Sequence, residues 1–418
     1  MFKVLRHRNF GLLWVGGVIS LIGDWMLFVG LPVFVYSLTN SALATGLTFM
    51  IETLPKVLGG SVAGVFVDRW NRKRVMVFCD VIRAIAVSSL LLVQSADMLW
   101  LVYIVAAVIS LTSQFFNPAE QAMIPHLVSE DLLMAANSTA AVGANLTRLI
   151  GPAIAGGLIH LLGFRIVLII DTVSFLVSGL LISMIIEKIA NPAHEESSDQ
   201  TATGWGSIWR DWIAGLKIVR QSRIVSTIFL IVALIAPAEG IIQVLFVIFV
   251  DNNLGGGAEK FGLLLTAQGI GGLTASLLIS KLGDNLTPRR LIGISAILNG
   301  FILIGIFNFA SFPVALGLFV LAGFPIVALM VSVQTLLQKS VPSEYLGRIF
   351  GSFSTTMAIM GLVGMGAASF LTDFVGLQPM LNVNAVLFIL TGIVALTVMP
   401  READVPAAMI EPEPIQAG

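Results

Sequence analysis

Charged residues are scarce in this chain of 418 residues: only 11% are Asp, Glu, Lys or Arg, whereas 57% are apolar. Soluble domains contain roughly 25% charged residues. A water-soluble fold could not cover so much apolar surface with polar groups, but an exterior that faces lipid does not need them. The scarcity of charge therefore excludes an ordinary soluble protein and predicts an integral membrane protein.

Cysteine and catalytic motifs are also lacking. Cys79 is the single cysteine, which excludes an intrachain disulfide and a cysteine-based metal cluster. The sequence contains no HExxH, GxSxG or phosphate-binding loop, and its four histidines are scattered. A net charge of -1 offers no basic face to nucleic acid. We therefore expect neither an enzyme nor an ATP-driven pump, and a protein that needs no cofactor or metal and binds no nucleic acid.

Long apolar runs recur along the whole chain. A helix needs about 20 residues to cross roughly 30 Å of hydrocarbon. On that length the runs are 10–36, 42–67, 75–93, 99–116, 135–162, 166–186, 224–250, 261–282, 291–310, 312–337, 349–371 and 377–399. They predict an all-α membrane protein of about twelve transmembrane helices in two six-helix halves.

Polar segments divide the chain into parts. The expected parts are an N-terminal half (1–187), a cytoplasmic linker (188–223), a C-terminal half (224–399) and a disordered tail (400–418). Within the linker, Trp205, Trp209 and Trp212 recur at helical spacing beside cations, which predicts a helix at the membrane interface. An extension of the next span is the alternative.

The positions of Lys and Arg predict the orientation of the chain. With the N-terminus inside, Arg165 and Lys260 would lie in outer loops, whereas most other cations would lie in inner segments. Because Lys and Arg are retained on the cytoplasmic side, we expect both termini in the cytoplasm and the spans in the inner or plasma membrane. We also expect a monomer that contacts the lipid bilayer.

An internal repeat supports two related halves. Asp68 begins the segment DRWNRKR after the second run, and Asp284 begins DNLTPRR after the eighth. Each acid precedes an adjacent cationic pair. Two halves of parallel topology separated by a long inside loop are the layout of one large class of transporters.

The first of these loops resembles the signature of the major facilitator superfamily, in which an acid near a Gly is followed by basic residues. The matching residues are Gly64, Asp68, Arg69, Arg72, Lys73 and Arg74. Asn71 stands where the family usually has Gly, and we expect Asn to supply the positive φ of a tight turn. The resemblance implies a charge latch that favours one transport state, whereas a merely positive inside loop is the alternative.

The fifth run resembles the antiporter signature of drug-exporting members of the superfamily. The matching residues are Gly151, Pro152, Gly156 and Gly157, whereas Ala155 replaces a Gly. Small residues allow close helix approach and Pro can kink a span, so a plain packing face is the alternative. Over nearly the whole of residues 1–399, and most clearly in the tracts LPKVLGGSVAGVFVDRWNRKR and LLQKSVPSEYLGRIFGSF, the chain resembles the macrolide-efflux and enterobactin-exporter branch. That resemblance implies proton-driven export of a sizeable amphipathic solute, although the fourth run lacks an arginine-bearing signature that is common there.

Ionisable residues near the middle of spans are the candidates for coupling. They are Asp24, Glu52, Lys56, Arg148 and Glu239. An uncompensated charge at the centre of an inserted helix costs roughly 2.5–3.5 kcal/mol. Glu52 and Lys56 have the spacing of a helical ion pair, which favours a structural role. Asp24 and Glu239 occupy the first helix of each half, so we expect one of them to bind the coupling proton, with Arg148 as a fixed cation.

Other acids and the polar or aromatic residues of the spans complete the candidates. Asp80 and Asp171 are expected nearer to helix ends, in structural roles, and a buried acid satisfied by a neighbour is the alternative for Asp24 and Glu239 as well. Candidate solute contacts are Trp25, Met26, Phe28, Gln114, Phe115, Gln243, Phe246 and Gln334. The function expected is a proton-coupled exporter of a drug, macrolide or siderophore. An importer of a small nutrient, a lipid or lysolipid transporter and a membrane-embedded enzyme are the alternatives.

Overall fold

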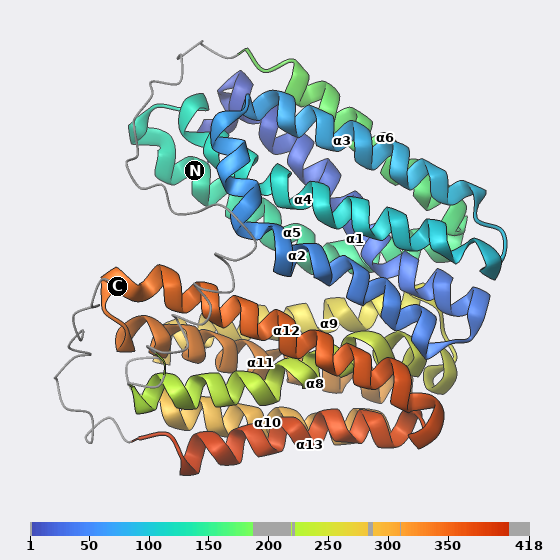
Figure 1. The fold of residues 1–418 in the computed structure, drawn as a ribbon, viewed down its shortest axis with the longest axis vertical. Helices are drawn as coiled ribbons and strands as arrows, with labels where there is room; N and C mark the ends of the chain where they lie inside the picture. Colours follow the sequence, from blue (N-terminus) through green and yellow to red (C-terminus); the bar gives the residue numbers. More distant parts are fainter. Residues whose placement is uncertain (1, 187–218, 220–221, 283–286, 310, 401–418) are drawn as a thin grey trace, which may run out of the picture. The chain divides into compact units, whose positions relative to one another are not determined.

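The computed structural model describes residues 2–186, 219, 222–282, 287–309 and 311–400 (Figure 1). Within these ranges the chain forms twelve α-helices, short 3-10 helices and no strand. The first six are α1 (Arg8–Thr39), α2 (Ala42–Arg69), α3 (Arg72–Ser89), α4 (Leu99–Leu127), α5 (Glu130–Leu162) and α6 (Phe164–Ser183). The others are α8 (Arg223–Leu254), α9 (Ala258–Leu282), α10 (Pro288–Asn308), α11 (Phe312–Ser340), α12 (Ser343–Val375) and α13 (Leu377–Thr397). Each predicted run falls on one of these helices, so the prediction of an all-α fold is confirmed.

The helices are suited to a membrane. Eleven of those described are long and apolar enough to cross one. Large apolar side chains such as Phe78, Ile85 and Leu180 are exposed along them, which suits contact with lipid rather than water. Helix α2 falls outside the eleven, and it contains Glu52 and Lys56 within its apolar sequence.

The chain divides into two compact units. In the part that the structure describes, unit 1 contains α1 to α6 together with Phe246–Thr266, which is the end of α8 and the start of α9. Unit 2 contains the rest of α8 and α9 with α10 to α13. The domain boundaries expected from the sequence stay predictions. Three features discussed above lie outside the described residues: the expected interfacial helix around Trp205, the residue Asp284, and the tail beyond Pro400.

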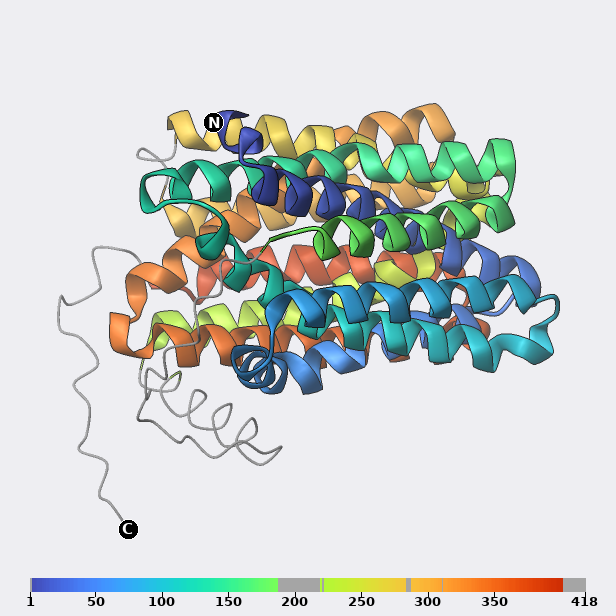
Figure 2. The same ribbon diagram turned by 90° about the horizontal axis from the view of Figure 1, so that it is seen from above.

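Small residues set the helix packing of unit 1. Helix α1 packs against α5 and α6, α2 packs against α4, and α3 packs against α4 and α6 (Figures 1 and 2). Gly23 of α1 leaves the space that the side chains of Asp171 and Ser174 of α6 occupy. Trp14 of α1 lies over Gly143 of α5 and donates a hydrogen bond of 3.0 Å to the carbonyl of Thr139. Such close approach is how helices associate where no water drives them together.

Small residues also set the helix packing of unit 2. Helices α10 and α13 lie side by side (Figure 1), and Gly293 and Gly392 face one another between them. Gly240 of α8 lies against the backbone of Gly361 of α12. Asn384 of α13 is fully buried and donates a hydrogen bond of 2.6 Å to the carbonyl of Ala238.

Candidate functional site

A cavity of about 330 Å³ opens within unit 1. Helices α1, α2 and α4 form its walls. The residues that line it are Leu21, Asp24, Trp25, Leu27, Phe28, Leu31, Pro32, Thr48, Phe49, Glu52, Lys56, Ala106, Ile109, Ser110, Ser113 and Asn117. Five residues selected from the sequence therefore meet at one place: Asp24, Trp25, Phe28, Glu52 and Lys56.

The α1 wall combines a carboxyl with aromatic rings. The rings of Trp25 and Phe28 meet edge to face with centroids 5.3 Å apart, and Phe28 meets Phe49 of α2 at 6.4 Å. Edge-to-face contact fixes the rings relative to one another. Among the described residues, no hydrogen bond or ion pair engages the Asp24 carboxyl. The wall thus offers an apolar surface beside an acid that remains free to accept a proton or a cationic group.

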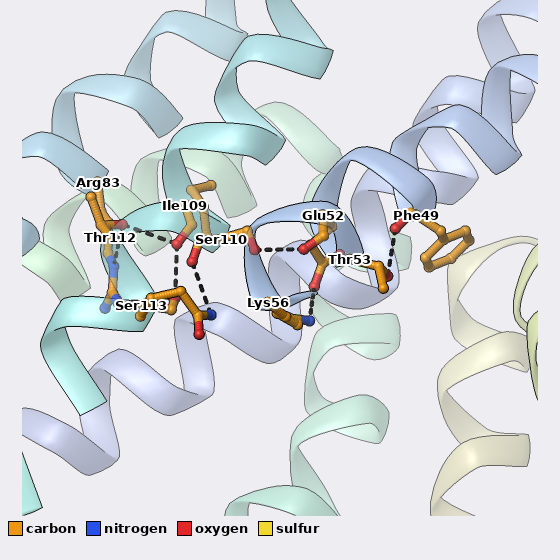
Figure 3. A network of polar contacts seen from close by, with 10 residues as sticks. Phe49, Glu52, Thr53, Lys56, Arg83, Ile109, Ser110, Thr112 and Ser113 are labelled. Carbon is orange, nitrogen blue, oxygen red and sulfur yellow. Dashed lines mark hydrogen bonds and ion pairs between the residues drawn. The ribbon is translucent and has the colours of Figure 1, made fainter. Parts of the chain in front are cut away.

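The α2 wall contains an ion pair (Figure 3). Lys56 Nζ lies 3.1 Å from Glu52 Oε1, one helical turn away on the same face. The hydroxyl of Ser110 on α4 donates a hydrogen bond of 2.5 Å to the backbone carbonyl of Glu52, which joins the α2 and α4 walls. Both charged side chains are partly exposed, so the pair contributes modestly to stability and keeps two opposite charges at the cavity.

Three charged residues behind the cavity are more deeply buried than the sequence indicated. Asp80, Arg83 and Asp171 are 0%, 2% and 1% exposed. The expectation that Asp80 and Asp171 lie near helix ends was wrong. Helix α3 and the turn after it form a span of Arg72–Leu92, which places Asp80 near its middle. Asp80 and Arg83 lie one helical turn apart inside an apolar run, and this spacing is the sequence signal for the buried pair.

The start of α3 explains this shift. Asn71 has φ of -68° rather than a positive φ, so the expected turn geometry was wrong. Its side chain instead accepts a hydrogen bond of 2.9 Å from the backbone N–H of Arg74, which caps the helix. Capping by Asn71 starts α3 at Arg72, before the apolar run begins.

The cations of the loop motif bind within unit 1. Arg72 donates a hydrogen bond of 3.3 Å to the carbonyl of Ala122 and contacts the ring of His126, both on α4. Lys73 donates one of 2.7 Å to the carbonyl of Ile185. The side chains of Gly64, Asp68 and Arg69 lie outside the described part, so the latch stays a prediction.

The antiporter-like segment of α5 contacts two other helices, α1 and α9. A Cβ on Gly151 would lie 2.7 Å from the ring of Trp25, so the lack of a side chain at Gly151 makes room for Trp25, which lines the cavity. Pro152 and Gly156 lie against the backbone of Gly262 and Ala258, at the start of α9 within unit 1. Nothing lies within 4 Å of a Cβ on Gly157.

The remaining candidates lie elsewhere. Met26 is buried, and Arg148 is exposed on α5, outside the set that lines the cavity. Gln114 donates a hydrogen bond of 3.4 Å within α4, and Phe115 stacks on Trp70. Phe246, near the end of α8, packs on Phe261 within unit 1. The candidates Glu239, Gln243 and Gln334 belong to unit 2.

Long apolar helices with exposed side chains, together with a cavity whose walls contain charged residues, are typical of a multi-pass membrane transporter. The chain belongs to the family described as transmembrane secretion effectors, within the major facilitator superfamily, and the match covers residues 1–415. Transporters of this family are not enzymes, and they move small molecules.

Relatives and solved structures agree with this assignment. The uncharacterized MFS-type transporter YfiS of Bacillus subtilis is 26% identical over 411 residues, which is 95% of each chain. Macrolide efflux protein A of Streptococcus pyogenes is 25% identical, over 92% of this chain and 95% of that protein. A bacterial homologue of the iron transporter ferroportin, solved in an inward-facing state, has a TM-score of 0.76 at 18% identity, over 95% of this chain and 99% of that one. The last likeness concerns the fold alone.

Proposed function

We propose that this transporter exports an amphipathic small molecule in exchange for protons, by alternating access across the inner or plasma membrane with both termini in the cytoplasm. The observation that carries the proposal is the cavity of unit 1, where the Asp24 carboxyl lies beside Trp25 and Phe28. Small-molecule sites are mostly apolar with a few fixed polar groups, and their volumes are about 300–1,000 Å³. The cavity fits that description.

Asp24 supplies the exchangeable charge in this mechanism. An ionised carboxyl within a membrane needs a cation, a proton or water. A cationic or amphipathic solute that reaches the aromatic wall displaces the proton from Asp24, and a proton replaces the solute after release. The Glu52–Lys56 pair faces the same space and balances its own charge. The relative named for macrolide efflux supports export and a large solute.

The test is uptake into inverted membrane vesicles, where export becomes inward accumulation. A panel of a macrolide, a lipophilic cation, a siderophore and a lysolipid is offered with and without an imposed proton gradient. We expect accumulation of at least one amphipathic solute, abolished by a protonophore. Accumulation that is indifferent to the gradient would exclude proton coupling, and transport of the lysolipid alone would replace the substrate class.

Asp97→Asn provides the matched control, because Asp97 is an exposed acid outside the cavity. It should leave accumulation unchanged, whereas Asp24→Asn should abolish it. Equal loss in the two variants would show a general defect rather than a role of the cavity.

A further inference from the structure

A buried arginine lies directly behind the α4 wall of the cavity. Arg83 belongs to α3, which does not contribute to the cavity lining. Its guanidinium donates a hydrogen bond of 3.0 Å to the Thr112 hydroxyl and another of 3.0 Å to the Ser113 hydroxyl (Figure 3). Ser113 lines the cavity and Thr112 does not. Arg83 is therefore one hydrogen bond away from the cavity.

The position of Arg83 is fixed from several sides. Its Nη1 lies 3.8 Å from Asp80 Oδ1 on the same helix. The guanidinium lies over the rings of Phe116 and Phe175, 4.8 and 5.6 Å from their centroids. A planar guanidinium suits this combination of directed hydrogen bonds and aromatic contact, whereas an ammonium does not. The charge cannot relocate to water, because the side chain is buried.

Four acids on four helices of unit 1 interact electrostatically with this cation. They are Asp24 of α1, Asp80 of α3, Glu120 of α4 and Asp171 of α6. Glu52 and Lys56 of α2 pair with one another and act on Asp24 as well. Among the described residues, the fully buried acids are Asp80 and Asp171 and the fully buried cation is Arg83. Both acids cannot be ionised together beside one cation without a large desolvation penalty.

We infer that Arg83 is a positioning residue whose fixed positive charge, held at the α4 wall by Ser113, acts on the Asp24 cavity and thereby sets the pH at which transport exchanges its proton. The inference rests on the proposed function. The sequence assigned the fixed cation to Arg148, but Arg148 is exposed and does not line the cavity. Arg83 takes that place because it reaches the cavity wall from behind.

The test is the pH dependence of solute binding to purified protein and of solute-driven proton movement in proteoliposomes. Arg83→Gln keeps hydrogen-bonding capacity but removes the charge. Its pH midpoint should move upward, because loss of a nearby cation makes ionisation of a carboxyl less favourable. Arg83→Lys keeps the charge, so its midpoint should lie closer to the wild-type value than the midpoint of Arg83→Gln.

A matched pair separates positioning from folding. Ser113→Ala and Thr112→Val each remove one hydrogen bond of Arg83, but only the first breaks the connection to the cavity. We expect Ser113→Ala to move the midpoint in the same direction as Arg83→Gln, and Thr112→Val to leave it in place. These two variants test the role of Arg83 even if Arg83→Gln does not fold.

Two outcomes overturn the inference, and they differ. A wild-type protein that couples protons through Asp24, with the same midpoint in Ser113→Ala and Thr112→Val, would show that Arg83 only supports the fold. A wild-type protein without proton coupling would remove the proposed function and this inference together.

Discussion

The two units solve the same packing problem with different chemistry. Within the described residues, the charged side chains that are fully buried, Asp80, Arg83 and Asp171, belong to unit 1. The buried polar side chains of unit 2, such as Asn299 and Asn384, are neutral. Gly-rich helix contacts are present in both. Because buried charge is expensive to retain, the difference supports the proposal that the coupling chemistry lies in unit 1.

The largest expected effect follows from exchanging an acid in each unit. Asp24→Asn should abolish gradient-driven accumulation, because the cavity loses its exchangeable proton. Glu239→Gln should reduce it far less. Both variants are compared in inverted vesicles at matched abundance. A greater loss for Glu239→Gln would move the coupling chemistry to unit 2.

Removing one buried polar partner from each unit should affect stability unequally. Asp80→Ala leaves Arg83 buried without its acid, which costs about 3–5 kcal/mol. Asn384→Ala removes a neutral donor from the carbonyl of Ala238, which costs about 1–3 kcal/mol. Thermal unfolding in detergent measures both. Equal losses would mean that the Asp80–Arg83 pair is no more important to the fold than an amide contact.

Substitutions at two glycines of α5 test whether the position of Trp25 matters for solute binding. Gly151→Ala places a methyl group against the Trp25 ring, and such overpacking costs about 1–3 kcal/mol and should weaken solute binding as the ring moves. Gly157→Ala meets no atom within 4 Å and should bind solute normally. Solute affinity of purified protein is the measurement, and unchanged affinity in Gly151→Ala would exclude Trp25 as a contact.

The smallest effect on stability is expected at the Glu52–Lys56 pair. These side chains are 32% and 51% exposed, and such pairs contribute about 0–1 kcal/mol. Lys56→Met should therefore leave the unfolding temperature nearly unchanged while it alters which solute charges are accepted. A large drop in unfolding temperature would show that the pair supports the fold, as the sequence first suggested.

Much of the fold was predictable, because lipid requires long apolar helices and these are visible as runs. Part of the cavity was predictable for the same reason: Asp24 and Glu52 stand out within apolar sequence. Arg83 is not among the candidates drawn from the sequence, because the cap at Asn71, which starts α3 before the apolar run, was not foreseen. The cation role given to Arg148 could not be checked from sequence, since helix rotation decides which side chains reach a cavity.

In the proposed mechanism, Asp24 releases a proton when solute enters the cavity of unit 1. The most direct measurement is the pH change of a weakly buffered solution of purified protein on addition of a transported solute. We expect proton release by the wild-type protein and by Glu239→Gln, and none by Asp24→Asn at solute concentrations that still saturate binding. Proton release that persists in Asp24→Asn would contradict the proposed role of Asp24.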